Sequence, residues 1–172
     1  MRKLVFAILA LVFAAAPAWA WEEYVYADQG FAIQFPVRPK IEKGTYESQR
    51  YGRLPATIYS AEDEHIQYKM TVAELGTRVD ESANLLAEAA YWLMRDGEVI
   101  FNDVPRVDQA QNGVFGLTMV LDLKDGRRMR TSIYAHRGRF YRADAIVLPA
   151  RGDKDMAIPS RFDQTLRFAL GR

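Results

Sequence analysis

The chain of 172 residues contains no cysteine and only two histidines, His65 and His136. The lack of cysteine excludes disulfides, thiolate metal sites, cysteine nucleophiles and a lipid-modified amino-terminal cysteine. A zinc site would need carboxylates to complete it, because neither histidine has a second ligand at helical spacing. His136 adjoins a turn, so we expect it to be exposed rather than a general base. We therefore predict no cofactor, no metal and no catalytic residue.

An excess of either charge is also lacking. The chain has 23 basic and 22 acidic residues, a formal net charge of +1. Proteins that bind nucleic acid carry a marked basic excess, so the composition gives no reason to expect such a partner. The acidic run Glu62-Asp63-Glu64 has no further ligand at suitable spacing, and we interpret it as a solvated turn.

Residues 1–20 have the three features of a cleaved signal peptide. Arg2 and Lys3 form a charged start, residues 4–16 are apolar, and Ala18-Trp19-Ala20 matches the small-x-small cleavage site. The apolar run is shorter than the roughly 20 residues that span a bilayer. We predict cleavage after Ala20 and export to the periplasm, with secretion beyond it as an alternative, and no membrane span afterwards.

Residues 21–172 are then predicted to form one globular α+β domain, an antiparallel sheet packed by two main helices. The opening strand alternates Phe31, Ile33 and Phe35 with polar or small residues and ends at Pro36. Asp28-Gln29-Gly30 supplies the turn that pairs it with the preceding strand, residues 21–26.

The strongest strand signals lie between residues 115 and 145. A three-residue loop ending in Gly126 pairs Leu121 with Met129 and Leu117 with Ile133, and it places glycine where the turn needs positive φ. For the next turn, at Arg137-Gly138-Arg139, we choose another odd loop, which pairs Ile133 with Ala143.

Two segments have the periodicity of helices. Residues 81–95 have one broad apolar side that includes Trp92, and Gly97 is placed to end this helix in a left-handed cap. Ser160-Arg161-Phe162-Asp163 has the form of a capping box that begins a second helix. Its apolar stripe is Phe162, Leu166, Ala169 and Leu170.

The chosen register places a group of basic and aromatic residues on the face opposite the core. The candidate ligand or partner surface consists of Arg128, Arg130, Tyr134 and Arg142. Arginine and tyrosine together suit a phosphate, a carboxylate or a sugar. The alternative is a structural charge network, in which Asp122 faces Arg128 and Asp144 lies near Arg130 and Arg142.

Three motifs give the chain a resemblance to a known group. They are Gly30-Phe31-Ala32-Ile33-Gln34-Phe35-Pro36, Arg139-Phe140-Tyr141, and residues 160–168, Ser-Arg-Phe-Asp-Gln-Thr-Leu-Arg-Phe. In order and spacing the chain resembles the small exported bacterial proteins of the PsbP-like fold group. The resemblance implies an antiparallel sheet between helices, in a group that includes the extrinsic photosystem subunit and other accessory proteins. It implies no catalytic residue.

Two functions fit these observations. The first is a non-enzymatic periplasmic accessory or binding protein that contacts a protein or an anionic envelope component. The second is a small periplasmic hydrolase with an unrecognised site. Because hydrolytic nucleophile motifs and phosphate-binding glycine loops are absent from the sequence, we favour the first.

Overall fold

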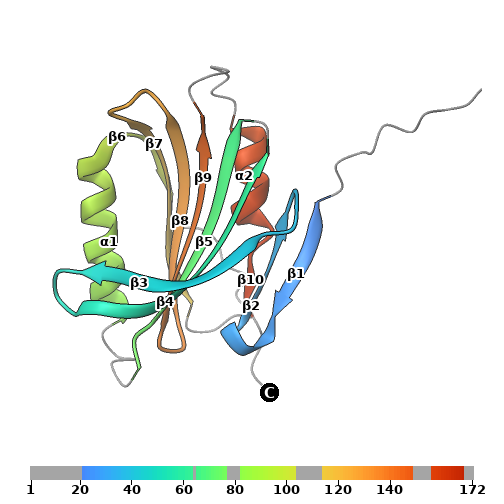
Figure 1. The fold of residues 1–172 in the computed structure, drawn as a ribbon. Helices are drawn as coiled ribbons and strands as arrows, with labels where there is room; N and C mark the ends of the chain where they lie inside the picture. Colours follow the sequence, from blue (N-terminus) through green and yellow to red (C-terminus); the bar gives the residue numbers. More distant parts are fainter. Residues whose placement is uncertain (1–20, 64, 77–81, 104–113, 149–155, 169–172) are drawn as a thin grey trace, which may run out of the picture.

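The computed structural model describes residues 21–63, 65–76, 82–103, 114–148 and 156–168. The predicted signal peptide lies outside these ranges. The described strands form two antiparallel sheets (Figure 1). The large sheet has the order β3-β4-β5-β9-β8-β7-β6 and the small sheet the order β1-β2-β10.

The strands of the large sheet are β3 (Lys40–Ser48), β4 (Gly52–Asp63), β5 (Ile66–Glu74), β6 (Gly97–Asp103), β7 (Phe115–Leu123), β8 (Arg128–His136) and β9 (Arg139–Val147). Those of the small sheet are β1 (Glu22–Tyr26), β2 (Phe31–Phe35) and β10 (Arg167–Phe168). A short 3₁₀ turn, η1 (Ala27–Gln29), joins β1 to β2.

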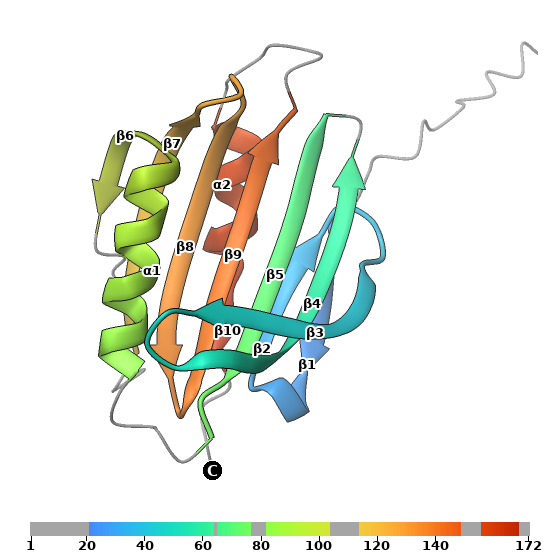
Figure 2. The same cartoon turned by 60° about the vertical axis from the view of Figure 1, so that its left-hand side comes forward.

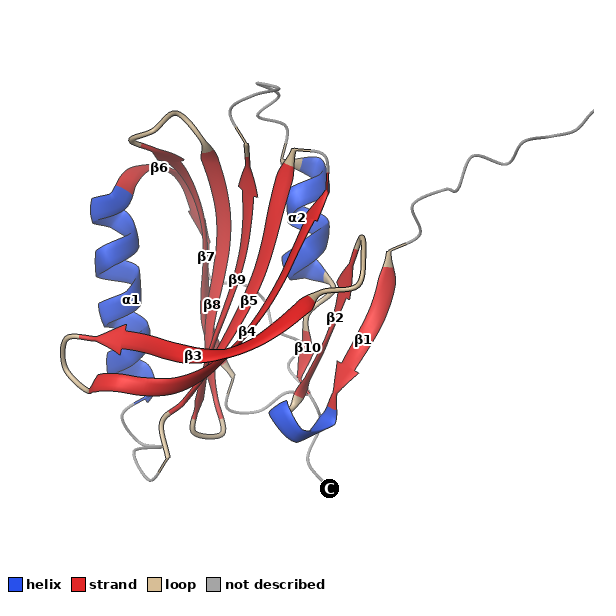
Figure 3. Ribbon diagram, in the orientation of Figure 1, coloured by secondary structure: helices blue, strands red, loops and turns tan. Residues whose placement is uncertain are grey.

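The large sheet is covered on both faces (Figure 3). Helix α1 (Ser82–Asp96) packs against β6, β7, β8 and β9. Helix α2 (Ala157–Gln164) packs on the other face against β8 and β9 and also contacts β2. The α+β class is therefore confirmed, but a sheet between two helices describes the layers only loosely, because the small sheet shares the second face with α2.

Two hydrophobic clusters correspond to these two faces. On the α1 side, Leu85 and Leu93 pack with core residues of β7, β8 and β9. On the α2 side, Phe31, Ile33 and Phe35 pack with the buried residues of β5 and β9 and with Phe162. Complete burial of a large apolar side chain contributes about 1.5–3 kcal/mol, so these three residues contribute substantially to holding the small sheet.

The opening hairpin follows the predicted pattern. Gly30 has a φ of 74° and its N–H donates to the Ala27 carbonyl over 3.0 Å. The Tyr141 hydroxyl donates to the Gln29 carbonyl over 2.9 Å, which fixes this turn against β9. An added Cβ on Gly30 would lie 3.3 Å from that hydroxyl. Glycine is thus required here both by conformation and by close approach.

Of the predictions for the two turns that join β7, β8 and β9, one is confirmed and one is wrong. The β7–β8 loop is the predicted one: Leu121 pairs with Met129, Leu117 pairs with Ile133, and Gly126 has a φ of 86°. The predicted β8–β9 register is wrong by one residue, because Ile133 pairs with Arg142 and not with Ala143. The loop there has two residues, Arg137 and Gly138, with φ of 48° and 71°. Both values suit a type I′ hairpin turn.

The helix ends also differ from the predictions. Gly97 is not among the residues with positive φ and begins β6 directly; a Cβ there would lie 2.5 Å from the Asp122 carbonyl oxygen. Trp92, which lies on the predicted apolar side of α1, is half-buried and does not belong to the core. Within the described residues, neither helix has the length and apolar character needed to cross a bilayer.

The predicted capping box at Ser160 is wrong. Helix α2 begins at Ala157, and the Ser160 hydroxyl lies inside it and donates to the Ala157 carbonyl over 2.8 Å. The chain leaves the helix after Gln164 and forms β10, which pairs with β2. The predicted stripe positions Ala169 and Leu170 lie outside the described residues.

We predict that Gly116→Ala lowers the free energy of unfolding by about 1–3 kcal/mol, the usual cost of overpacking. The new Cβ would lie 2.4 Å from the ring of Tyr134, which is buried opposite Gly116 on β8. Urea unfolding followed by tryptophan fluorescence measures the change.

The matched control is Gly44→Ala, whose Cβ would lie 3.1 Å from the flexible end of Ile58. We expect it to stay within about 0.5 kcal/mol of the wild type, as an exposed substitution does. Equal losses in the two variants would contradict the packing argument.

Candidate functional site

The four residues of the predicted surface do not share a face. In β8, Arg128, Arg130 and Tyr134 face α2, since they alternate with Met129 and Ile133 of the α1-side core. Arg142 pairs with Ile133 and therefore faces α1. The predicted β8–β9 register, which is wrong by one residue, had placed all four residues on one face. Whether any of them contacts a partner stays a prediction.

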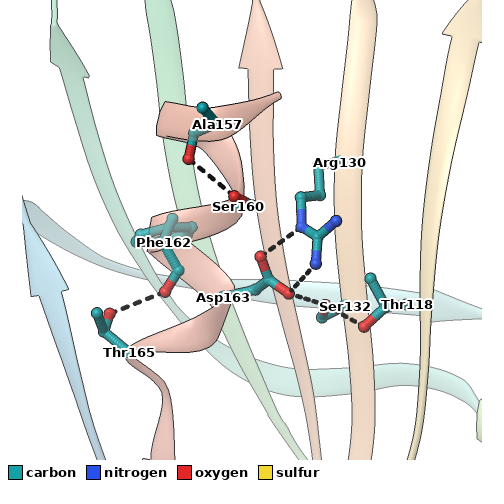
Figure 4. A network of polar contacts seen from close by, with 8 residues as sticks. All are labelled: Thr118, Arg130, Ser132, Ala157, Ser160, Phe162, Asp163 and Thr165. Carbon is teal, nitrogen blue, oxygen red and sulfur yellow. Dashed lines mark hydrogen bonds and ion pairs between the residues drawn. The ribbon is translucent and has the colours of Figure 1, made fainter. Parts of the chain in front are cut away.

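On the α2 side, a polar network joins the helix to the sheet (Figure 4). Arg130 donates to both carboxylate oxygens of Asp163, from Nε over 2.6 Å and from Nη2 over 2.9 Å. Ser132 Oγ donates to Asp163 Oδ2 over 2.9 Å, and the Thr118 and Ser132 hydroxyls share a hydrogen bond of 2.7 Å. Charge-assisted bidentate pairs of this kind are strong and directional. The network thus fixes α2 on β8.

The remaining residues on this face also have internal contacts. Arg128 forms a bidentate ion pair with Asp122 over 2.7 and 2.8 Å. The alternative of a structural charge network predicted this contact. Burial raises the pKa of Tyr134 and the nearby Asp163 carboxylate raises it further, so the phenol stays protonated at neutral pH. His136 is buried and lies 5.4 Å from the ring of Phe168, so the prediction of an exposed His136 is wrong.

On the α1 side, Asp144 connects β9 to β8. Its Oδ1 accepts hydrogen bonds from Arg142 Nε over 2.8 Å and from Thr131 Oγ1 over 2.6 Å. The predicted proximity of Asp144 to Arg142 is confirmed, but Arg130 pairs with Asp163 instead. Burial lowers the pKa of Arg142, but Asp144, together with Tyr46 and Asp96, raises it, and the net result is a raised pKa. The arginine is charged, and its side chain is 26% exposed.

Arg142 lies at the edge of an open polar area that we call the Arg142 face, defined by Ser60, Lys69, Thr71, Arg142 and Asp144. Ser60 pairs with Lys69, Lys69 with Asp144, and Thr71 with Arg142, so the five occupy adjacent positions on one side of β4, β5 and β9. Directly paired residues have Cβ atoms about 4.5–5.5 Å apart. One small ligand group therefore spans several of them.

Two elements border this face (Figure 2). Helix α1 stands on one side, and the β3–β4 hairpin crosses the sheet below, so no helix covers the part of β5 between them. Glu88 of α1 holds the hairpin tip: it accepts from Ser48 Oγ over 3.0 Å and from the Gln49 N–H over 2.7 Å. A hollow of about 390 Å³ opens beside the face, lined by Ser60, Ala61, Glu62, Gln67, Tyr68 and Lys69.

Sequence reasoning missed Lys69 and Thr71. They alternate with the buried Tyr68, Met70 and Val72, and this pattern alone indicates an ordinary solvent-facing side of a strand. Nothing in the local sequence shows that β5 lies beside β9. Only the sheet order brings them next to Arg142 and Asp144.

The arrangement of sheets and helices is PsbP-like. Among solved structures, the chain is similar to the solution structure of cyanobacterial PsbP (CyanoP) from Synechocystis sp. PCC 6803, with a TM-score of 0.55 and 12% sequence identity. The match covers 90% of this chain and 95% of that chain, which confirms the resemblance inferred from the motifs. At this identity the likeness concerns the fold alone. No family model and no curated protein matches the sequence.

We predict that Asp163→Asn lowers the free energy of unfolding by about 3 kcal/mol, because it leaves a largely buried arginine without its counter-charge. The side chains of Arg130 and Asp163 are 14% and 7% exposed. Chemical denaturation measures the loss.

Asp122→Asn is the control for this change. The side chains of Arg128 and Asp122 are more exposed, at 22% and 29%. We expect this substitution to lower the free energy of unfolding by no more than about 1 kcal/mol. Similar costs in the two variants would show that the contact between α2 and β8 is not specially stabilising.

Proposed function

We propose that this chain is a non-catalytic accessory or binding protein of the periplasm, exported by residues 1–20 and folded as a single domain over residues 21–172. Its partner is a protein or an anionic component of the cell envelope. The PsbP-like fold supports this proposal as a scaffold, since the similar solved structure is a PsbP protein. No nucleic acid is expected, because the chain is close to neutral.

The observation that carries the proposal is the Arg142 face. Lys69 is exposed, and the Thr71 hydroxyl is buried without a hydrogen-bond partner in the described part of the chain. Buried polar groups are normally hydrogen-bonded, so this hydroxyl marks a strand position beside Lys69 where the fold leaves hydrogen-bonding capacity unused. On the α2 side, by contrast, Arg128 and Arg130 are paired with Asp122 and Asp163.

The buried carboxylates support binding over catalysis. Asp144 and Asp163 are 1% and 7% exposed, and each accepts hydrogen bonds from an arginine and a hydroxyl. A general acid or base must reach the substrate within hydrogen-bond distance. Carboxylates held in this way serve the fold.

Export is tested by expressing the full chain with a carboxy-terminal tag in a diderm host. We expect a periplasmic product whose mass corresponds to a start at Trp21. The variant Ala18→Arg disrupts the small-x-small site and should accumulate as the longer precursor. A full-length, unprocessed wild type would contradict the proposed export.

Binding is tested with a photo-crosslinking residue placed at Gln67, which lines the hollow beside the Arg142 face. The matched control is the same residue at Val25, which is 68% exposed in β1. We expect a discrete adduct in intact cells from position 67 and none from position 25. No adduct from position 67, or the same adduct from both, would count against a partner at this face.

A further inference from the structure

We propose that the Arg142 face binds a compact oxyanion, a phosphate or carboxylate group of its ligand, through Lys69, Ser60 and Arg142. This inference rests on the proposed binding function and narrows the chemistry of what is bound. The argument depends on which hydrogen-bonding groups of the face are already used.

The unused groups on the face are donors. Lys69 offers three N–H bonds, and Ser60 offers one hydroxyl. Among the described residues, neither side chain has a hydrogen bond or ion pair. The Thr71 Oγ1 also lacks a partner there, but it is enclosed and does not reach the surface. The acceptor between them, Asp144, is already engaged by Arg142 and Thr131. An acceptor-rich ligand group complements such a set.

Arg142 is prepared for the same kind of ligand. Its Nε is fixed on Asp144, while Nη2 has only the weak Met129 sulfur acceptor at 3.8 Å. The guanidinium is therefore oriented, and 26% of the side chain stays accessible. A planar guanidinium with free N–H groups suits the oxygens of phosphate and carboxylate, and Lys69 adds a point charge on the neighbouring strand β5, opposite Asp144.

Carboxylates at the margin restrict what fits. Asp96 of α1 acts on Arg142 electrostatically, and Glu62 lines the hollow, where it accepts a hydrogen bond from Gln67 over 3.3 Å. Together with Asp144 they offset the charges of Lys69 and Arg142. An extended polyanion would meet more of these carboxylates than one compact oxyanion does. The face is therefore suited to a single anionic group.

The test is a titration of the mature protein, residues 21–172, with inorganic phosphate and, separately, with acetate at constant ionic strength, followed by amide chemical shifts in NMR. We expect saturable shifts at positions 60, 67–71 and 142–144. The anion with the lower dissociation constant identifies the preferred group. Lys69→Ala should weaken its binding about tenfold, the effect of losing one charge-assisted hydrogen bond.

Two further variants make the outcome specific. Lys43→Ala removes the same charge from the opposite face, where Lys43 donates to Thr57 over 2.8 Å, and it should leave binding unchanged. Thr71→Val should leave binding unchanged and raise the unfolding midpoint, because it removes an enclosed hydroxyl that lacks a partner among the described residues. A residue with a purely structural role would lose stability and leave binding unaffected.

The inference is overturned if neither anion gives saturable shifts at these positions, or if Lys43→Ala weakens binding as much as Lys69→Ala. Either result, together with a crosslinked adduct from position 67, would refute the oxyanion site and leave the proposed binding function intact. Saturable binding without an adduct would instead support the site and refute a macromolecular partner at this face.

Discussion

The two-residue turn at Arg137 and Gly138 determines which side of the large sheet each residue of β9 faces. Successive side chains of a strand point to opposite faces, so a change of one residue in this loop would exchange the two sets. With the observed turn, Tyr141 faces the small sheet and its hydroxyl donates to the Gln29 carbonyl. Arg142 and Asp144 then face α1. The attachment of the first hairpin and the polar character of the α1 side both depend on this one turn.

Two buried arginine–carboxylate pairs have different roles because they lie on different faces. Arg130 and Asp163 join elements 33 residues apart in sequence, and their contact holds α2 against β8. Arg142 and Asp144 are neighbours on one strand, so their contact brings no distant elements together. It neutralises a buried carboxylate and orients the guanidinium beside solvent. The first pair therefore stabilises the tertiary structure, while the second shapes a surface.

Part of the α1 side of the large sheet is open because neither α1 nor the β3–β4 hairpin extends over it. Helix α1 packs on β6 to β9, and Glu88 holds the β3–β4 hairpin across the sheet below. Between them, Lys69 and Thr71 keep donors that no described residue satisfies. The other two arginines of the predicted surface, Arg128 and Arg130, form ion pairs with Asp122 and Asp163. A binding function is thus best sought where the fold leaves hydrogen-bonding capacity unused.

The sequence by itself determined the features that depend on local pattern. Alternation identified β2 and the β7–β8 hairpin, positive-φ glycines identified the turns at Gly30 and Gly126, and an apolar stripe identified α1. Tertiary structure decided the β8–β9 register, since both faces of the sheet are buried and alternation then favours neither. It also decided the partner of Arg130 and the place of Lys69 beside Asp144. Those contacts join strands and a helix whose adjacency no local pattern encodes.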